Sequence, residues 1–125
     1  VLWAASSAVN TDFTAKLVDV FPDGRAINIT SGILRAPFRD GFDQWNELTS
    51  GEPYEFHLEL RPTANVFGQG HCIRVDISSS DFPRFDRNLN TTGADFSNKT
   101  EMVPADQQVF HDRKRPSRII LPVLE

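Results

Sequence analysis

The sequence holds one cysteine, Cys72, and no apolar run that approaches the roughly 20 residues of a membrane span. A lone cysteine excludes an internal disulfide framework and favours a reducing compartment, so we expect a cytoplasmic protein without a membrane segment. Three N-x-S/T sequons, at Asn28, Asn90 and Asn98, point the other way. In a chain this rich in threonine we attribute them to chance.

Positive charge is also in short supply, and the motifs of nucleophilic and metal-dependent catalysis are missing. The 13 Lys and Arg residues against 17 Asp and Glu give a net charge of −4, which argues against a nucleic-acid partner. No glycine opens a G-x-S-x-G nucleophile elbow, and neither H-E-x-x-H nor C-x-x-C occurs. His71 and Cys72 are adjacent, so on a strand they point to opposite faces and cannot hold one metal ion. We expect no catalytic residue, no cofactor and no metal site in this chain.

What the sequence does have is alternation of apolar and polar residues, the pattern of half-buried antiparallel strands. The alternation is cleanest in YEFHLEL, residues 54–60, and in CIRVDIS, residues 72–78. The stretch from Pro22 to Gly24 predicts a tight turn, Gly32 predicts a β-bulge, and residues 40–48 predict a single turn of helix. Further strands are expected at 1–6, 13–21, 25–36, 107–112 and 117–124.

About seven short strands separated by turn signals predict an all-β sandwich, formed by a single domain over residues 1–125. The Cys…Trp…Cys signature of immunoglobulin domains is absent, so a jelly roll is the favoured topology. The chain opens directly into a strand, so we expect a fragment of a larger protein.

One loop, SSSDFPRFDRNLNTTG at 78–93, is too regular in composition to be a plain connection. The residues from Asp86 to Asn90 alternate as in the first half of an EF-hand. The required glycine is two positions late, however, and Ser97 stands where a bidentate glutamate is needed. We therefore interpret the loop as a structural corner that Phe82 and Phe85 anchor in apolar surface.

Four stretches in order resemble a known family. They are LWAASSAVNTDFTAKLVDVFPDGRAINITSGILRA, GEPYEFHLELRPTANVF, GQGHCIRVDISSSDFPRFDRNLNTTG and RPSRIILPVLE, and together they cover most of the chain. They are similar to the C-terminal non-catalytic domain of the X-Pro dipeptidyl-peptidase-like hydrolases, the family of cocaine esterase and the α-amino-acid ester hydrolases. Two positions depart from the family pattern: Cys72 and Pro37, where basic residues are commoner.

The resemblance implies a jelly-roll (galactose-binding-like) sandwich that lacks its first strand or strands, because the family domain begins further upstream. It also implies a partner, the α/β-hydrolase domain that carries the Ser-His-Asp triad of the parent protein. The function implied is that of an accessory domain of a serine hydrolase acting on ester or X-Pro peptide bonds. Such a domain packs on the catalytic domain, helps to shape the substrate entrance and is compatible with homo-oligomers.

On this interpretation Arg84, Arg87, Phe85 and His71 are the candidate residues of an interface between domains. Exposed pairs of adjacent Arg and Asp contribute little stability, whereas the planar fork of arginine suits carboxylates or carbonyls across an interface. The competing interpretation is that the loop's Arg and Asp residues only satisfy each other locally.

An alternative from another functional class is a free-standing jelly roll that binds carbohydrate. A sugar site needs an exposed Trp or Tyr beside polar side chains, and Trp45 near Asp43 and Asn46 is the candidate cluster. The bland interpretation of the same cluster is that Trp45 anchors its loop.

Overall fold

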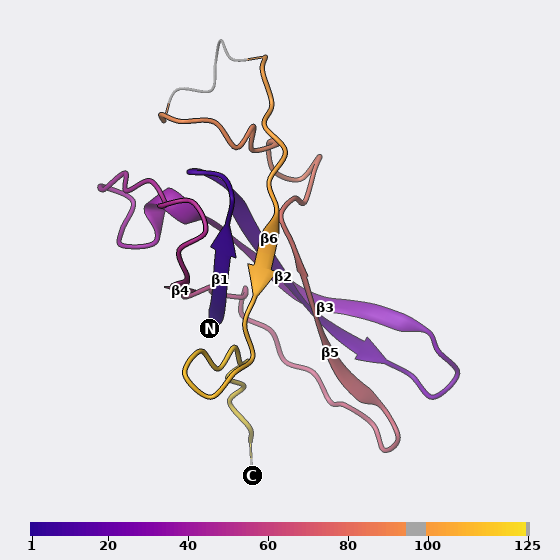
Figure 1. The fold of residues 1–125 in the computed structure, drawn as a ribbon. Helices are drawn as coiled ribbons and strands as arrows, with labels where there is room; N and C mark the ends of the chain where they lie inside the picture. The colour runs from indigo at the N-terminus through magenta and orange to yellow at the C-terminus, as the bar shows by residue number, and fades with distance from the viewer. Residues whose placement is uncertain (95–99, 125) are drawn as a thin grey trace.

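The structure, a computed structural model that describes residues 1–94 and 100–124, is built almost entirely from short strands (Figure 1). These residues contain no α-helix, and none of their helical segments is long and apolar enough to cross a membrane. The elements are β1 (Leu2–Ser6), β2 (Asp12–Val20), β3 (Ala26–Arg35), the 3₁₀ helix η1 (Ala36–Phe38), β4 (Tyr54–Phe56), β5 (Cys72–Ser78) and β6 (Gln107–Val109).

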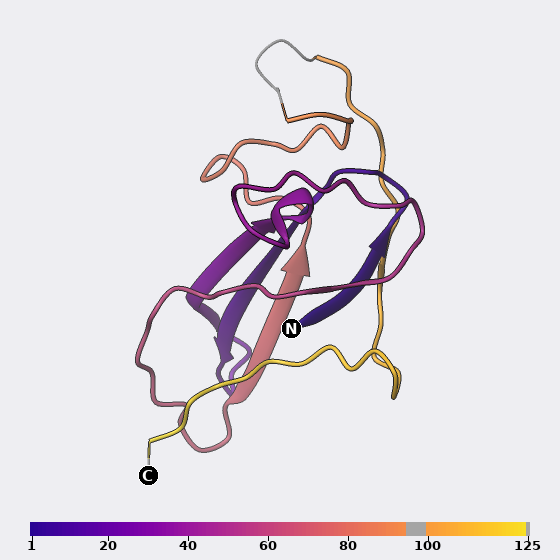
Figure 2. The same cartoon turned by 90° about the vertical axis from the view of Figure 1, so that its left-hand side faces the viewer.

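The strands form two antiparallel three-stranded sheets, which confirms the predicted all-β sandwich. One sheet has the order β4-β1-β6 and the other the order β3-β2-β5. Figure 2 shows them as separate layers, and the chain crosses from one to the other between β1 and β2. Strands β5 and β6 are edge strands of their sheets within the described residues.

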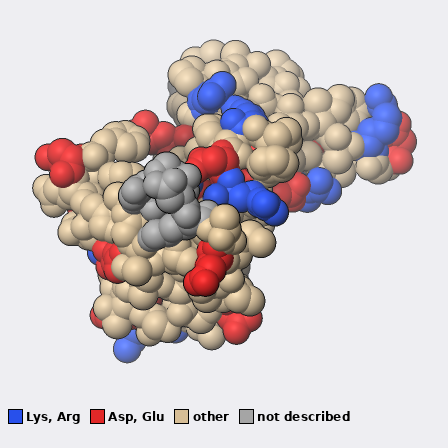
Figure 3. Space-filling model, turned by 90° about the horizontal axis from the view of Figure 1, so that it is seen from above, with Lys and Arg blue, Asp and Glu red and all other residues tan. Residues whose placement is uncertain are grey.

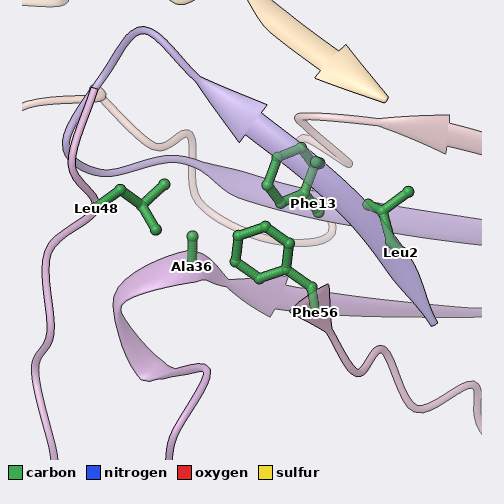
Figure 4. Close-up of a cluster of buried hydrophobic side chains, with 6 residues drawn as sticks. Leu2, Phe13, Ala36, Leu48 and Phe56 are labelled. Carbon is green, nitrogen blue, oxygen red and sulfur yellow. The ribbon is translucent and has the colours of Figure 1, made fainter. Parts of the chain in front are cut away.

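Alternation along β2 decides which side chains face the other sheet. Phe13, Ala15 and Leu17 point inward, whereas Asp12 and Lys16 point to the outer face. The core cluster lies at one end of the sandwich, where the rings of Phe13 and Phe56 are 4.9 Å apart (Figure 4). Its other members are Leu2, Ala4, Ala36 and Leu48.

The β2–β3 hairpin confirms the predicted turn. The Phe21 amide donates to the Arg25 carbonyl at 2.8 Å, the Gly24 amide donates to the Phe21 carbonyl at 2.9 Å, and Gly24 has a φ of +88°. Such a φ favours glycine because it has no Cβ. The hairpin projects from the body of the molecule as an arm (Figures 1 and 3), with an acidic and a basic side chain side by side at its tip.

The predicted bulge at Gly32 is wrong in position. The irregularity falls where Leu17 pairs with Thr30 but Val18 pairs with Asn28, so Ile29 is the extra residue. Gly32 pairs regularly with Ala15 of β2, and its lack of a side chain instead leaves room for another segment of the chain. A Cβ there would lie 2.0 Å from the carbonyl oxygen of Glu59. Gly32 therefore lets residues 58–61 pass directly over β3.

That crossing also explains why the predicted strand 54–60 ends at Phe56. The Arg61 amide donates to the Ser31 carbonyl, and the Thr30 hydroxyl donates to the Arg61 carbonyl at 2.8 Å. The segment thus leaves β1 to lie on β3, although its burial still alternates, with Phe56 buried, His57 exposed and Leu58 half-buried.

Three other expectations are corrected. The predicted strand 107–112 is limited to Gln107–Val109. Residues 117–124 form no strand. The Arg118 amide bonds the Val1 carbonyl, but beyond this bond the segment meets no partner strand among the described residues. The helical turn lies at Ala36–Phe38 instead of 40–48. Pro37 cannot donate a ladder hydrogen bond, but its fixed φ suits the first turn of a helix, so β3 ends there.

We expect Gly32→Ala to destabilise the isolated chain by about 2–3 kcal/mol, the range of an overpacked site. Urea unfolding followed by circular dichroism measures it. Gly24→Ala is the control: its added Cβ meets open space, so only the positive φ costs stability, about 1 kcal/mol. A Gly32→Ala chain as stable as the parent would contradict the close approach, since alanine is otherwise favoured over glycine in strands.

Candidate interdomain surface

The outer face of the β3-β2-β5 sheet carries a buried polar network centred on Asp12. The Asp12 side chain is 2% exposed and accepts two hydrogen bonds from Arg35, from Nε at 2.9 Å and from Nη2 at 3.1 Å. The two residues are direct cross-strand partners. This contact raises the pKa of the Arg35 guanidinium above its ordinary value, although burial acts in the opposite direction. The pair is therefore a charged, bidentate bond held largely away from water.

The loop after β5 completes this network. Asn88 donates from Nδ2 to Asp12 Oδ1 at 2.7 Å and to Asn10 Oδ1 at 2.9 Å. Asp86 contacts the Arg35 guanidinium at 3.3 Å, and Asn90 donates to the Val103 carbonyl at 2.9 Å. Of the alternating residues that resemble half of an EF-hand, Asp86 and Asn88 thus fasten the loop to the sheet, and Asn90 fastens it to the segment before β6.

The predicted interface residue Arg84 also contacts its own domain. Its Nη1 atom donates to the Ser31 hydroxyl at 2.6 Å and lies 3.6 Å from a carboxylate oxygen of Asp81. Asp81 is shared, because Lys16 Nζ lies 3.0 Å from its other oxygen. Arg84 therefore fastens the loop to the outer face of β2 and β3.

The remaining loop residues are arranged differently from the expectation. Phe85 is half-buried, as an anchor should be, but Phe82 is 65% exposed and does not anchor the loop in apolar surface. The Arg87 guanidinium lies 5.7 Å from the centre of the Phe82 ring. These two side chains pack on each other at the surface instead of entering the core.

The fourth candidate, His71, lies on the opposite face of the same sheet. Its Nδ1 is 2.8 Å from Asp19 Oδ1, and its ring packs against that of Phe21 at a tilt of 47°, with centroids 4.2 Å apart. Asp19 belongs to the inward-facing set of β2, whereas Lys16 and the loop near Arg84 lie on the outer face. The structure thus brings Arg84 and Phe85 together, places Arg87 against Phe82 on the same loop, and leaves His71 apart from them, packed against the arm.

A groove of about 440 Å³ opens between the two sheets along the β5 and β6 edges. Val75 and Ile77 of β5, which are 37% and 39% exposed, face it together with Val109 of β6. Ile119 and Ile120 of the C-terminal segment close one side. The inner face of β5 is therefore apolar but only partly covered.

The basic residues Arg113, Lys114 and Arg115, which follow β6, form a self-contained turn. Asp112 accepts hydrogen bonds from the amides of Lys114 and Arg115 and pairs with the Arg115 side chain at 2.7 Å. The Arg115 contact lowers the pKa of Asp112. Arg115 in turn lies 3.8 Å from the centre of the Phe110 ring. This geometry is that of a solvated hairpin.

The fold agrees with the comparisons with known proteins. Residues 1–120 match the family of X-Pro dipeptidyl-peptidase C-terminal non-catalytic domains. The chain belongs to this family.

Three relatives place the X-Pro dipeptidyl-peptidase C-terminal domain within longer chains. Cocaine esterase of Rhodococcus sp. (strain MB1 Bresler) is 46% identical over 125 residues, covering 99% of this chain and 22% of that protein. An α-amino acid ester hydrolase structure has a TM-score of 0.83 and 31% identity over 91% of this chain and 20% of its own. An aminopeptidase structure from a marine sediment Thaumarchaeota archaeon has a TM-score of 0.86 and 28% identity, over 92% and 21%. The chain spans about a fifth of each relative's length.

Reasoning from the sequence missed the network around Asp12, whose members look unremarkable one by one. Asn10, Thr11 and Asp12 are a polar run between two apolar strands, the pattern of an exposed turn, yet all three are buried. The usable signal was the regular placement of Asp86 and Asn88 in a loop that lacks metal-binding geometry, because such side chains need partners elsewhere.

We expect Asp12→Ala to destabilise the isolated domain by about 3 kcal/mol, because Arg35 and Asn88 would each lose a buried charged acceptor. Denaturant unfolding measures the loss. Asp23→Ala is the matched control, since it also removes a carboxylate bonded to an arginine, but at an exposed turn. Its unfolding midpoint should stay close to that of the parent. Equal losses in the two variants would mean that burial does not set the strength of the Asp12 contacts.

Proposed function

We propose that this chain is the accessory C-terminal domain of a serine hydrolase that acts on ester or X-Pro peptide bonds. The observation that carries the proposal is the family match over residues 1–120, joined to relatives about five times longer. In the parent protein a serine of an α/β-hydrolase domain would attack the carbonyl and form an acyl-enzyme, which water then clears. The accessory domain would pack on that domain and help to shape the substrate entrance.

The polypeptide encoded before Val1 tests this function. It should contain a G-x-S-x-G nucleophile elbow, and the full polypeptide should hydrolyse p-nitrophenyl esters or X-Pro amides. The purified 125-residue chain should not. An upstream region without an elbow, or turnover by the isolated chain that one serine substitution abolishes, would reject the proposal.

We also propose that upstream strands of the same polypeptide fill the groove between the sheets. The support is physical: β5 and β6 are edge strands, and apolar side chains line the open space between them. An uncovered edge with apolar neighbours is a template for association, which proteins normally cover. Residues 119–124, predicted as part of a strand but without a partner strand among the described residues, would then have one.

An extended chain that includes those strands should protect the backbone amides of β5 and residues 117–124 from hydrogen exchange. It should also melt at a higher temperature and bind less of a hydrophobic dye than the 125-residue chain. The amides of β2, which is paired on both sides already, serve as the internal control. Unchanged protection at β5 would contradict the covering of this edge.

The interface proposal for the loop after β5 can now be divided between its two arginines. Arg84 has partners in its own domain, whereas Arg87 contacts only an exposed ring among the described residues. We expect Arg84→Ala to cost the isolated chain about 1 kcal/mol and Arg87→Ala to change its stability by less than about 0.5 kcal/mol.

In the full polypeptide, Arg87→Ala should loosen the docking of the domain and lower activity. Limited proteolysis and steady-state kinetics report these two effects, with Arg84→Ala as the comparison. If Arg87→Ala leaves both readouts unchanged, Arg87 is not an interface residue. His71, packed against the arm, remains a separate candidate, tested in the same way by His71→Asn.

Two smaller proposals concern the cellular location of the protein and its self-association. Cys72 is an exposed free thiol, which fits the cytoplasmic location expected from the lone cysteine. Self-association of the full polypeptide would fit the edge strands and is measured by analytical ultracentrifugation. A secreted, glycosylated product would reject the cytoplasmic location. A full polypeptide that stays monomeric at all concentrations would reject self-association.

A further inference from the structure

The segment from the last residue of η1 onward, residues 38–48, presents an aromatic side chain to solvent. Phe42 is 89% exposed, although the ring of Phe38 lies close to it. Phe38 lies 6.1 Å from it, centroid to centroid, and meets Trp45 edge-on at 5.2 Å. We call residues 38–48 the aromatic loop. An exposed phenylalanine on top of a ring cluster is unusual for a connection, which is normally polar.

Hydrogen bonds within and beside the aromatic loop order the backbone on either side of Phe42. The Asn46 amide donates to the Pro37 carbonyl at 2.9 Å, and the Asn46 side chain donates to Asp40 Oδ2 at 2.9 Å. Arg39 donates from Nη1 to the carbonyls of Ala36 and Asn46. The loop is therefore ordered before any partner arrives, so little conformational entropy would be lost when it binds.

The immediate surroundings of Phe42 are acidic. Asp43 is exposed and takes part in no ion pair among the described residues, and Asp40 is half-exposed and 3.7 Å from Arg39. Figure 3 shows Asp and Glu at the left-hand edge of the molecule, where this loop lies. An apolar knob with carboxylates beside it is complementary to an apolar pocket with basic side chains at its rim.

We propose that the aromatic loop is a docking element. Its partner is an apolar pocket, bordered by Lys or Arg, on the hydrolase body of the same polypeptide. The inference rests on the proposed function, which supplies that body. Preorganised aromatic side chains are the usual anchors of protein interfaces, because they bury a large area at a small entropic cost.

A carbohydrate partner fits these atoms less well. Trp45 is half-buried by its contact with Phe38 and donates from Nε1 to Glu47 at 3.3 Å. Asn46 uses its amide, its carbonyl and its side chain within the loop. The polar groups of Trp45 and Asn46 that a sugar would need are therefore already engaged.

Photo-crosslinking in the full polypeptide tests the docking. With p-benzoylphenylalanine in place of Phe42, we expect one dominant crosslink, within the chain, to a peptide of the hydrolase body that contains Lys or Arg. Asp40→Asn combined with Asp43→Asn should lower its yield about two- to fivefold, the range of exposed ion pairs, as should high salt. The same photo-reactive residue at Val66, also 89% exposed, is the matched control and should not give this crosslink.

The other outcomes would overturn the inference. These are a crosslink to a second copy, the same products from positions 42 and 66, or loss of the crosslink on adding soluble oligosaccharides. A polypeptide with the nucleophile elbow and hydrolase activity but no crosslink would reject the docking role and leave the proposed function standing. A polypeptide without the elbow would reject the proposed function itself.

Discussion

The carboxylate of Asp12 is the constraint on which the rest of the structure depends. It lies at the first residue of β2, just after the chain has crossed from one sheet to the other, and it is almost fully buried. A buried carboxylate is tolerated only where its oxygens are bonded. Arg35 must therefore be opposite it, which fixes the register of β2 and β3, and Asn88 must reach it from the loop after β5.

This requirement explains the order of a long loop that has no regular secondary structure. Residues 79–94 are fastened at Asp81, Arg84, Asp86 and Asn88 to the outer face of the sheet, and at Thr92 and Gly93 to Glu47. Polar contacts of this kind are directional, so they position the loop more sharply than apolar burial alone would. The result is a rigid surface on one side of a domain whose apolar core is small.

Much of the fold could be predicted from the sequence, because alternation and turn chemistry are local. The runs around Phe13, Ile27 and Ile73 form strands close to the expected bounds, and the turn at Gly24 has the expected geometry. The failures have a common cause in contacts distant along the chain. The strand after Tyr54 ends because residues 58–61 are drawn across β3 at Gly32. The polar run at Asn10 to Asp12 looks like a turn but is buried by a loop almost 80 residues later.

The candidate site shows the same limit. The composition of the loop after β5 was enough to single it out, but composition does not reveal whether an arginine points inward or outward. Arg84 and Arg87 are only three residues apart, yet one bonds Ser31 of β3 and the other lies on an exposed ring.

How well each part of this domain is ordered depends on where its apolar side chains are buried. At the Phe13–Phe56 end, both sheets contribute large side chains and the core is closed. Along β5 and β6 the inner face is equally apolar, but within the described residues nothing closes it. Val and Ile side chains that line a groove open to water contribute little to the stability of the domain. The isolated domain therefore depends on its polar network more than a complete sandwich would. The outer face, by contrast, holds the loop 79–94 through polar contacts within the domain, so this face can be presented, already ordered, to another domain.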